Sequence, residues 1–395
     1  MLLIKRRSSM SLQSSFIVAA RRSAIGRVGG LHRHRRIEEL AGPVIIAALA
    51  DAGIAPDRVD ELIAGNISAG GNPARLMALA AGLPGTVVAL TVDRDCASGL
   101  DAILQGARLI ATGEASVVVA GGAESLSTAP WRIAKPRTVY QTPRFDNQHA
   151  AYDLTGEADP HIAAAELLAS ELQLSREALD AYALRSHIRA YLAHEAKRFL
   201  GEIVPLRMSA EEARDESLDG DLTADDLAEF PPFTEGGRSA PGNTALPHDG
   251  AAFAVLVSET IWRELGEIPG LRLKASVACG VVPGREASAP VEALRKLGER
   301  VNGSGLRAFG QFELGETSAA QAIAVRDQLG LEDEQLNPDG GALARGLPIG
   351  ASGAISIARL FTRMARRRGK EFVRQGIVVQ GCKGGIGVAA AFEAV

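Results

Sequence analysis

The sequence predicts an α/β fold of two related halves, each with a mostly parallel sheet covered by helices on both faces. Short runs of β-branched residues alternate with longer segments whose apolar residues recur at helical spacing. Strands that alternate with helices need crossover connections, which place helices on both faces of the sheet. One order of motifs also occurs twice. Cys96-Ala-Ser-Gly precedes a helix and the run from Val117, and Gly350-Ala-Ser-Gly precedes a helix and the run from Ile377.

Individual elements are predicted from their apolar patterns and from the residues that end them. The segment at 37–52 has helical apolar spacing and is followed by Gly53, which is typical of a helix C-terminus. The run at 117–120 is apolar throughout, as in a buried strand. By the same criteria we expect strands at 16–19, 59–65, 87–92, 117–120, 271–282 and 377–380, and helices at 37–52, 96–112, 161–172, 176–200, 319–329 and 353–368.

The chain divides into more than one core unit, because 395 residues exceed the size at which a single core usually stops growing. We expect a frayed N-terminus at 1–15, an N-terminal half at 16–124 and 248–257, an inserted segment at 125–247 and a C-terminal half at 258–395. A long insertion between two α/β halves is a common place for a substrate-facing subdomain.

Composition narrows the function classes. The chain is 46% hydrophobic and 23% charged, with a net charge of −4, so it is typical of a globular enzyme and we expect no nucleic-acid partner. Three cysteines far apart favour a reducing compartment, here the cytoplasm, over a disulfide framework. We expect no membrane span, since no apolar run is long enough, and no metal site, since the acidic stretch at 211–229 lacks regular ligand spacing.

Cys96 is the candidate nucleophile, because it lies at the entrance of a predicted helix. The free N–H groups and the helix dipole at such a place lower a thiol's pKa, and the thiolate is the reactive form. Asp93 and Asp95 oppose ionisation, and Arg94 is a candidate to offset one of these charges. The residues alone leave two interpretations open, a reactive thiolate and a buried structural cysteine.

A series of motifs in order resembles the thiolase family over nearly the whole chain. They are Val18-Ala-Ala-Arg-Arg-Ser-Ala-Ile-Gly-Arg, Gly71-Gly-Asn-Pro-Ala-Arg, Cys96-Ala-Ser-Gly-Leu, Gly121-Gly-Ala-Glu-Ser-Leu-Ser-Thr-Ala-Pro, Asp180-Ala-Tyr-Ala-Leu-Arg-Ser, Asp249-Gly-Ala-Ala, Asn337-Pro-Asp-Gly-Gly-Ala-Leu-Ala-Arg-Gly-Leu-Pro-Ile-Gly-Ala-Ser-Gly-Ala and Gly384-Gly-Ile-Gly-Val-Ala. The family comprises acetyl-CoA acetyltransferases and 3-ketoacyl-CoA thiolases.

The resemblance implies a fold and a chemistry. It implies two duplicated βαβαβαββ halves in a layered α/β/α/β/α core, with a coenzyme-A-facing loop domain inserted in the N-terminal half. It implies a homodimer or homotetramer, an acyl-CoA substrate and no permanently bound cofactor. Cys96 stands where the family's cysteine accepts an acyl group, which a second nucleophile then removes; such covalent catalysis divides a difficult transfer into two easier steps.

The same comparison indicates a degenerate active site. Leu347 stands where the family has its catalytic histidine, and Gly315 where it has the asparagine that holds an oxyanion-hole water. The second catalytic cysteine, counted back from the terminal glycine motif, falls on Gly381, so that Cys382 is one residue late. A one-residue shift on a strand would turn the thiol to the other face.

Further substrate-binding positions follow from the resemblance. The loop-domain histidine position falls on Pro160, next to His161. Ala245 replaces a serine, and His248 lies in a segment that the family places near the coenzyme. His161 and His248 are therefore candidate substitutes for the missing imidazole, although each is also consistent with a structural histidine. Gly350 and Gly384 complete the expected substrate-binding set.

Two functions remain open. One is an acyl-CoA acyltransferase that forms a thioester on Cys96, with thiolysis and condensation weak or lost. A positioned acid–base group is typically worth roughly 10²–10⁴-fold in rate, and an oxyanion donor about 10²–10³-fold. The other is an inactive homologue that binds acyl-CoA or serves as a partner subunit in a hetero-complex.

Overall fold

The computed structural model describes residues 13–136, 138–145, 159–206, 213–301, 305–367 and 372–395. The predicted frayed N-terminus falls almost entirely outside these residues. The strands are β1 (Ser15–Ser23), β2 (Gly26–Arg27), β3 (Glu61–Gly65), β4 (Val88–Val92), β5 (Val117–Glu124), β6 (Ile133–Ala134), β7 (Arg144–Phe145), β8 (Ile203–Val204), β9 (His248–Ser258), β10 (Leu271–Gly280), β11 (Gln311–Leu314), β12 (Gln375–Cys382) and β13 (Ile386–Ala394).

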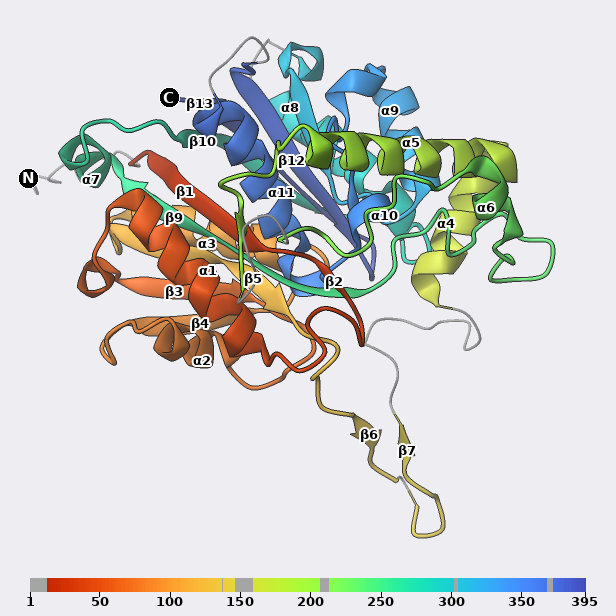
Figure 1. Cartoon of the computed structure of the whole chain (residues 1–395), viewed down its shortest axis with the longest axis horizontal. Coiled ribbons are helices and arrows are strands. Elements are labelled where there is room, and N and C mark those ends of the chain that lie inside the picture. Colours follow the sequence, from red (N-terminus) through yellow and green to blue (C-terminus); the bar gives the residue numbers. More distant parts are fainter. Residues whose placement is uncertain (1–12, 137, 146–158, 207–212, 302–304, 368–371) are drawn as a thin grey trace, which may run out of the picture.

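Helices connect these strands (Figure 1). They are α1 (Ile37–Ala52), α2 (Pro73–Ala80), α3 (Ser98–Thr112), α4 (Pro160–Glu171), α5 (Arg176–Glu195), α6 (Ala224–Glu229), α7 (Glu259–Glu264), α8 (Ala289–Arg300), α9 (Ala319–Leu329), α10 (Ala342–Arg345) and α11 (Ser352–Phe361). Among the described residues, no helix is both long and apolar enough to cross a membrane.

The two halves repeat one strand order, which confirms the predicted duplication. The N-terminal half has the order β4-β3-β5-β9-β1, and the C-terminal half has β11-β12-β13-β10. A parallel bridge from Phe312 to Leu336 takes the place of the outermost strand in the C-terminal half. In the N-terminal half β9 runs antiparallel to its neighbours β5 and β1, and in the C-terminal half β13 runs antiparallel to β12 and β10. The other neighbouring strands within each order are parallel. The halves join where β1 pairs with β10 at Phe16 and Arg272.

Helices and sheets form the predicted five layers. α1 and α2 pack on the outer face of the N-terminal half, and α8 and α9 on that of the C-terminal half. α3 and α11 pack against each other between the halves. Strand alternation divides the apolar residues accordingly: Val118 and Ala120 of β5 join this inner core, whereas Val117 and Val119 face α1.

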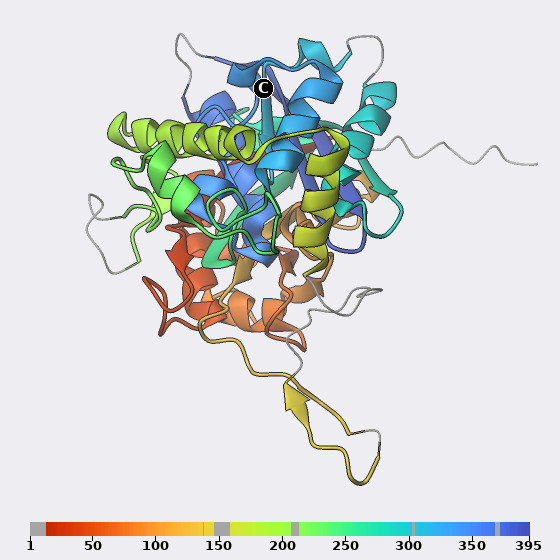
Figure 2. The same ribbon diagram turned by 90° about the vertical axis from the view of Figure 1, so that its right-hand side faces the viewer.

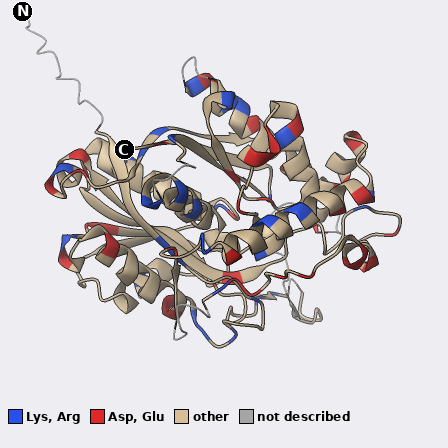
Figure 3. Ribbon diagram, turned by 45° about the horizontal axis from the view of Figure 1, so that its top comes forward, with Lys and Arg blue, Asp and Glu red and all other residues tan. Residues whose placement is uncertain are grey.

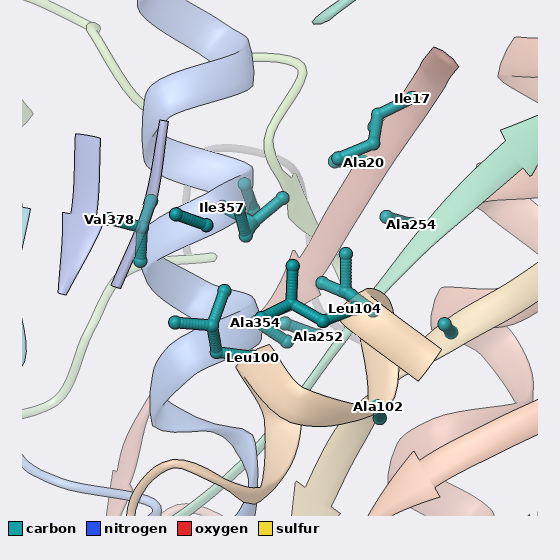
Figure 4. Close-up of a cluster of buried hydrophobic side chains, with 14 of the residues drawn as sticks. Ile17, Ala20, Leu100, Ala102, Leu104, Ala252, Ala254, Ala354, Ile357 and Val378 are labelled. Carbon is teal, nitrogen blue, oxygen red and sulfur yellow. The ribbon is translucent and has the colours of Figure 1, made fainter. Parts of the chain in front are cut away.

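The inner layer is tightly packed (Figure 4). Leu100 and Leu104 of α3 lie among Ala354 and Ile357 of α11 and side chains of both halves. A Cβ added at Gly353 would lie 2.6 Å from the Leu100 backbone nitrogen, so only glycine permits this approach. This contact brings the first turns of the two helices together.

The segment between β5 and β9 covers one end of the core with α4, α5 and α6 (Figure 2). Its Glu202 is fully buried, accepts a hydrogen bond from Arg22 Nε at 2.6 Å and also pairs with Arg359. Arg22 and Arg359 belong to β1 and α11, so one carboxylate connects the insertion to both halves. The β6–β7 hairpin projects from the body, and Trp131 packs edge-on against Phe145 there.

Several boundaries differ from those predicted. α3 begins at Ser98 instead of Cys96, β5 continues through both glycines to Glu124, and α5 ends at Glu195 instead of residue 200. The strand continues because β3 and β9 pair with it on both sides, so tertiary pairing outweighs the turn preference of glycine. Charged side chains lie mainly on the outer helices and loops, whereas the strands are mostly uncharged (Figure 3).

Candidate active site

Cys96 lies in a tight turn between β4 and α3. Asp95 before it has a left-handed backbone (φ 49°), a conformation that aspartate tolerates better than most residues. Both the backbone N–H and the thiol of Cys96 donate to Asp95 Oδ1, at 2.7 and 3.0 Å. Ser98 Oγ donates to the Asp95 carbonyl at 2.6 Å and accepts from the Arg94 N–H, which fixes the turn.

The sequence left two interpretations of Cys96 open, and the structure favours a buried thiol over a thiolate, because the thiol is protonated at neutral pH. Only 3% of Cys96 is exposed, and this burial raises its pKa well above 9.0. The negative charge of Asp95 raises the pKa further, as the sequence indicated, while Lys383 opposes the shift. Arg94 instead pairs with Asp101 at 2.9 Å. Burial thus outweighs the helix-terminus effect.

Cys382 lies on the same side of the sheet as Cys96. Along β12, Val378 and Cys382 face the inner core, whereas a Cβ at Gly381 would meet Pro290 of the outer layer at 2.8 Å. Burial raises the pKa of Cys382 to about 12, with Asp95 adding to the shift and the Ala97 N–H opposing it. The one-residue offset therefore does not turn this thiol away from Cys96.

Leu347 occupies the inner core with Cys96, Cys382 and Ala245. Its backbone N–H donates to Leu246 O at 3.1 Å, and its carbonyl accepts from His248 N–H at 3.0 Å. The segment that carries the replaced position is therefore in place, but its side chain is apolar and only 4% exposed. It has no atom that can take or give a proton.

The space beside Gly315 holds the side chain of Gln380. A Cβ at Gly315 would overlap the Gln380 side-chain oxygen. Gln380 Nε2 donates to Ser356 Oγ at 3.1 Å, and its oxygen is buried without a partner. The Gln380 amide thus fills the space that a side chain at residue 315 would need.

His161 and Lys383 form the polar side of the site. His161 lies in the first turn of α4, its backbone N–H donating to Asp159 Oδ1 at 2.9 Å, and both of its ring nitrogens are buried without a partner. Burial lowers its pKa, as does Lys383, while Asp159 and Asp95 oppose this. Lys383 pairs with Asp159 at 3.2 Å. The imidazole is therefore neutral. The charges of Asp95 and Lys383 act on the pKa of both His161 and Cys96.

The remaining predicted positions have different surroundings. Gly350 N–H donates to Glu124 Oε2 at 2.9 Å, and its carbonyl packs against Gly65 and Gly99, so Gly350 joins the halves. Gly384 has a left-handed backbone (φ 80°) in the turn after β12. His248 lines a cavity whose described wall residues do not include Cys96.

Glu124 collects five hydrogen bonds at the junction of the halves. It accepts from Asn66, the backbone of Ile67, the backbone and hydroxyl of Ser68, and Gly350. Burial raises its pKa to about 7, although each of these bonds favours the ionised form.

Sequence comparison places the chain in a family. Models of the thiolase N-terminal and C-terminal domains match residues 15–260 and 269–394. The putative acetyl-CoA C-acetyltransferase VraB of Staphylococcus epidermidis is 34% identical over 388 residues, which cover 97% of this chain and 99% of that protein. Its namesake in Staphylococcus aureus is 34% identical over 384 residues, covering 96% and 99%.

Structural comparison agrees. The acetyl-CoA acetyltransferase of Bacillus anthracis has a TM-score of 0.88 and 34% identity, over 98% of this chain and 100% of that one. The chain therefore belongs to the thiolase family. Within that family, it is similar over nearly its whole length to acetyl-CoA acetyltransferases.

Three site residues were missed by the sequence analysis. Asp95 was considered only as a charge, whereas it is the hydrogen-bond partner of the thiol. Lys383 and Gln380 were not selected, although both flank Cys382 in sequence. Strand alternation could have indicated that Gln380 shares a face with Cys382, because the two are two residues apart.

Asp95→Asn should make Cys96 more reactive, because the amide tolerates the same backbone but removes a charge that opposes the thiolate. Alkylation of Cys96 by iodoacetamide should accelerate about tenfold per pH unit between about pH 7 and 9, since its pKa lies above this range. The variant should react on the order of tenfold faster at a fixed pH within it. Peptide mass spectrometry would measure both, with Asp93→Asn as control; a slower variant would identify Asp95 as the base for the thiol.

Gly315→Asn should destabilise the protein by about 1–3 kcal/mol through overpacking against Gln380. Adding Gln380→Ala should recover much of this loss, because it vacates the overlapping position. Chemical unfolding of the single and double variants would measure the coupling. Gly85→Asn is the matched control, since a Cβ there meets open space. If Gly315→Asn lowers the free energy of unfolding equally with and without the Gln380 side chain, the predicted overlap between the two side chains is wrong.

Proposed function

We propose that this protein is a thiolase-type acyl-CoA acyltransferase that carries the acyl group as a thioester on Cys96. The observation that supports this most is that Cys96 and Cys382 face the same inner core, and that the charge of Asp95 acts on the pKa of both thiols. In the first half-reaction the Cys96 sulfur bonds to the thioester carbon, the bond from that carbon to the coenzyme sulfur breaks, and the departing thiolate takes a proton.

The proton that leaves the Cys96 thiol must reach the departing coenzyme thiolate without the family's histidine. The Cys96 thiol already donates to Asp95. The charges of Asp95 and Lys383 act on both Cys96 and His161, and both ring nitrogens of His161 are unpartnered. We therefore assign His161 to proton transfer, together with a substrate-facing role for the insertion at 125–247.

The second half-reaction is expected to be slow. Thiolysis and condensation need a group that handles protons at the attacking nucleophile, and Leu347 and Gly315 supply none. Loss of a positioned acid–base alone typically costs roughly 10²–10⁴-fold. An acceptor that brings its own base is therefore the better partner for the Cys96 thioester. The buried free cysteines fit a cytoplasmic setting.

A second candidate is an inactive homologue that binds acyl-CoA or a partner subunit. The raised pKa of Cys96 and its 3% exposure favour it, because both reduce the amount of available thiolate. The two candidates differ in one observable, a covalent acyl group on Cys96.

Incubation with acetyl-CoA and longer acyl-CoAs should give one acyl adduct on Cys96, because its thiolate can attack the thioester without a group at Leu347 or Gly315. Intact-mass measurement should find the adduct in Cys382→Ser and not in Cys96→Ser. Its formation should accelerate as pH rises, in parallel with the thiolate fraction. Absence of any adduct with a folded protein would leave the inactive homologue.

We also propose a homodimer formed through β4. This strand pairs only with β3 among the described residues, so its other edge is open. Val88 and Leu90 on it are 59% and 47% exposed, and Leu76 and Leu79 of α2 add a similar apolar surface. An exposed apolar edge strand readily pairs with another chain.

Leu90→Lys should therefore shift the protein toward monomers, because it places a charge on the apolar edge. Light scattering after size-exclusion chromatography would report the mass. Leu192→Lys on α5 is the control, since Leu192 is also 59% exposed but lies elsewhere. If the dimer is unaffected by Leu90→Lys and disrupted by Leu192→Lys, the interface does not lie at β4.

A further inference from the structure

A second cavity of about 530 Å³ lies between the insertion and the start of β9. Its walls are mostly apolar, and Arg27, His187, Ser217, Asp219 and His248 are among the polar residues that line it. Thr244, Leu246 and His248 line it, whereas Ala245 between them packs into the inner core that holds Cys96. The segment thus separates two compartments, and Ala245, the position that the resemblance assigns to coenzyme A, faces the other one.

A serine and a histidine of the cavity wall lie within hydrogen-bond distance of each other. Ser217 Oγ and His248 Nε2 are 2.8 Å apart, and His248 Nδ1 is 2.8 Å from Leu246 O. A carbonyl oxygen only accepts, so Nδ1 carries the hydrogen and Nε2 accepts from the serine hydroxyl. This is the arrangement of a nucleophile, a base and a group that orients the base.

The histidine is held rigidly. A Cβ at Gly346 would overlap its ring, and Gly346 has a positive φ of 97° that favours glycine. The His248 N–H donates to Leu347 O at 3.0 Å, which fixes the backbone beside the ring. Ring orientation is therefore set by packing and by two backbone bonds.

Charges around the pair suit a neutral base and an anionic intermediate. Burial lowers the pKa of His248, as does Arg27, while the Leu246 carbonyl, Glu216 and Asp215 oppose this. Arg27 Nε donates to Ser217 Oγ at 3.2 Å. A guanidinium next to the attacking oxygen is close to the ester carbonyl oxygen, on which the negative charge of the tetrahedral intermediate develops.

We propose that Ser217 and His248 form a second acyl-transfer site, which hydrolyses small apolar carboxylic esters. Apolar walls suit an uncharged substrate, and the cavity wall carries opposite charges at Arg27 and Asp219 instead of an excess of one sign. This site uses neither Cys96 nor coenzyme A, so it is independent of the function proposed above.

The reaction balances with water as the only co-reactant. His248 Nε2 takes the hydroxyl proton as Ser217 Oγ bonds to the ester carbon, and the oxyanion forms beside Arg27. The bond from that carbon to the alcohol oxygen breaks, and the alcohol leaves with the proton from His248. Water then attacks the acyl-serine, gives a proton to His248 and releases the acid, and Ser217 recovers its proton.

The test uses the full chain with Cys96→Ser, so that no acyl chemistry at Cys96 contributes. A fluorophosphonate probe should label Ser217, as located by peptide mass spectrometry, and p-nitrophenyl butyrate should be hydrolysed. Ser217→Ala should abolish labelling and reduce hydrolysis by at least about 10²-fold, and His248→Gln should do likewise. Ser116→Ala, at an exposed serine remote from the cavity walls, should change neither.

The opposite outcome is equally definite. If folded Cys96→Ser protein gives no adduct at Ser217, or hydrolyses the ester equally well with Ser217→Ala, the pair only connects the insertion to β9. Circular dichroism and thermal midpoints would establish folding of each variant. In the chain with Cys96 intact, Ser217→Ala should leave acylation of Cys96 unchanged, so failure of one site is distinguishable from failure of the other.

Discussion

The close approach of Gly350 to three other glycines is the constraint on which this architecture depends. A Cβ at Gly65 would lie 2.6 Å from Gly350 O and one at Gly99 2.9 Å from it, and one at Gly122 would overlap it. These glycines end β3, begin α3 and lie in β5, whereas Gly350 precedes α11. Side chains here would separate the halves, and with them Cys96 from the Leu347 segment. The site exists because backbone meets backbone at this point.

Tight packing also explains the electrostatics of the site. The halves enclose Cys96 so completely that desolvation decides its protonation state, and the donors at the start of α3 do not reverse this. A carboxylate in contact with the thiol adds to the effect. Family members are expected to offset such costs with an imidazole, whereas here leucine and glutamine fill the corresponding region. Two polar groups act on the thiol in opposite directions: the charge of Asp95 raises its pKa, and that of Lys383 lowers it.

Sequence patterns predicted the duplicated fold, because strand and helix periodicities and the repeated Ala-Ser-Gly motif are local properties. α1 and α9 were predicted at their observed bounds. The family resemblance located Cys96, Leu347 and Gly315. The features that the sequence could not predict depend on contacts between distant segments. Counting residues placed the second cysteine at Gly381, but the pairing of β12 with β13 presents Cys382 to the core. The sequence left open whether Cys96 is a thiolate or a buried thiol, because its burial depends on both halves together.

Glu124 gives the junction of the halves a dependence on acidity that opposes that of the chemistry. Its pKa is raised from 4.5 to about 7 in the folded chain, so folding favours its protonated form. The stability that this group contributes is present below its unfolded pKa and is lost as pH rises through about 7. Alkaline conditions, however, are those that generate the thiolate at Cys96. A pH that ionises the Cys96 thiol therefore also removes the stability that Glu124 contributes to the junction of the halves. The two groups set opposite demands on pH.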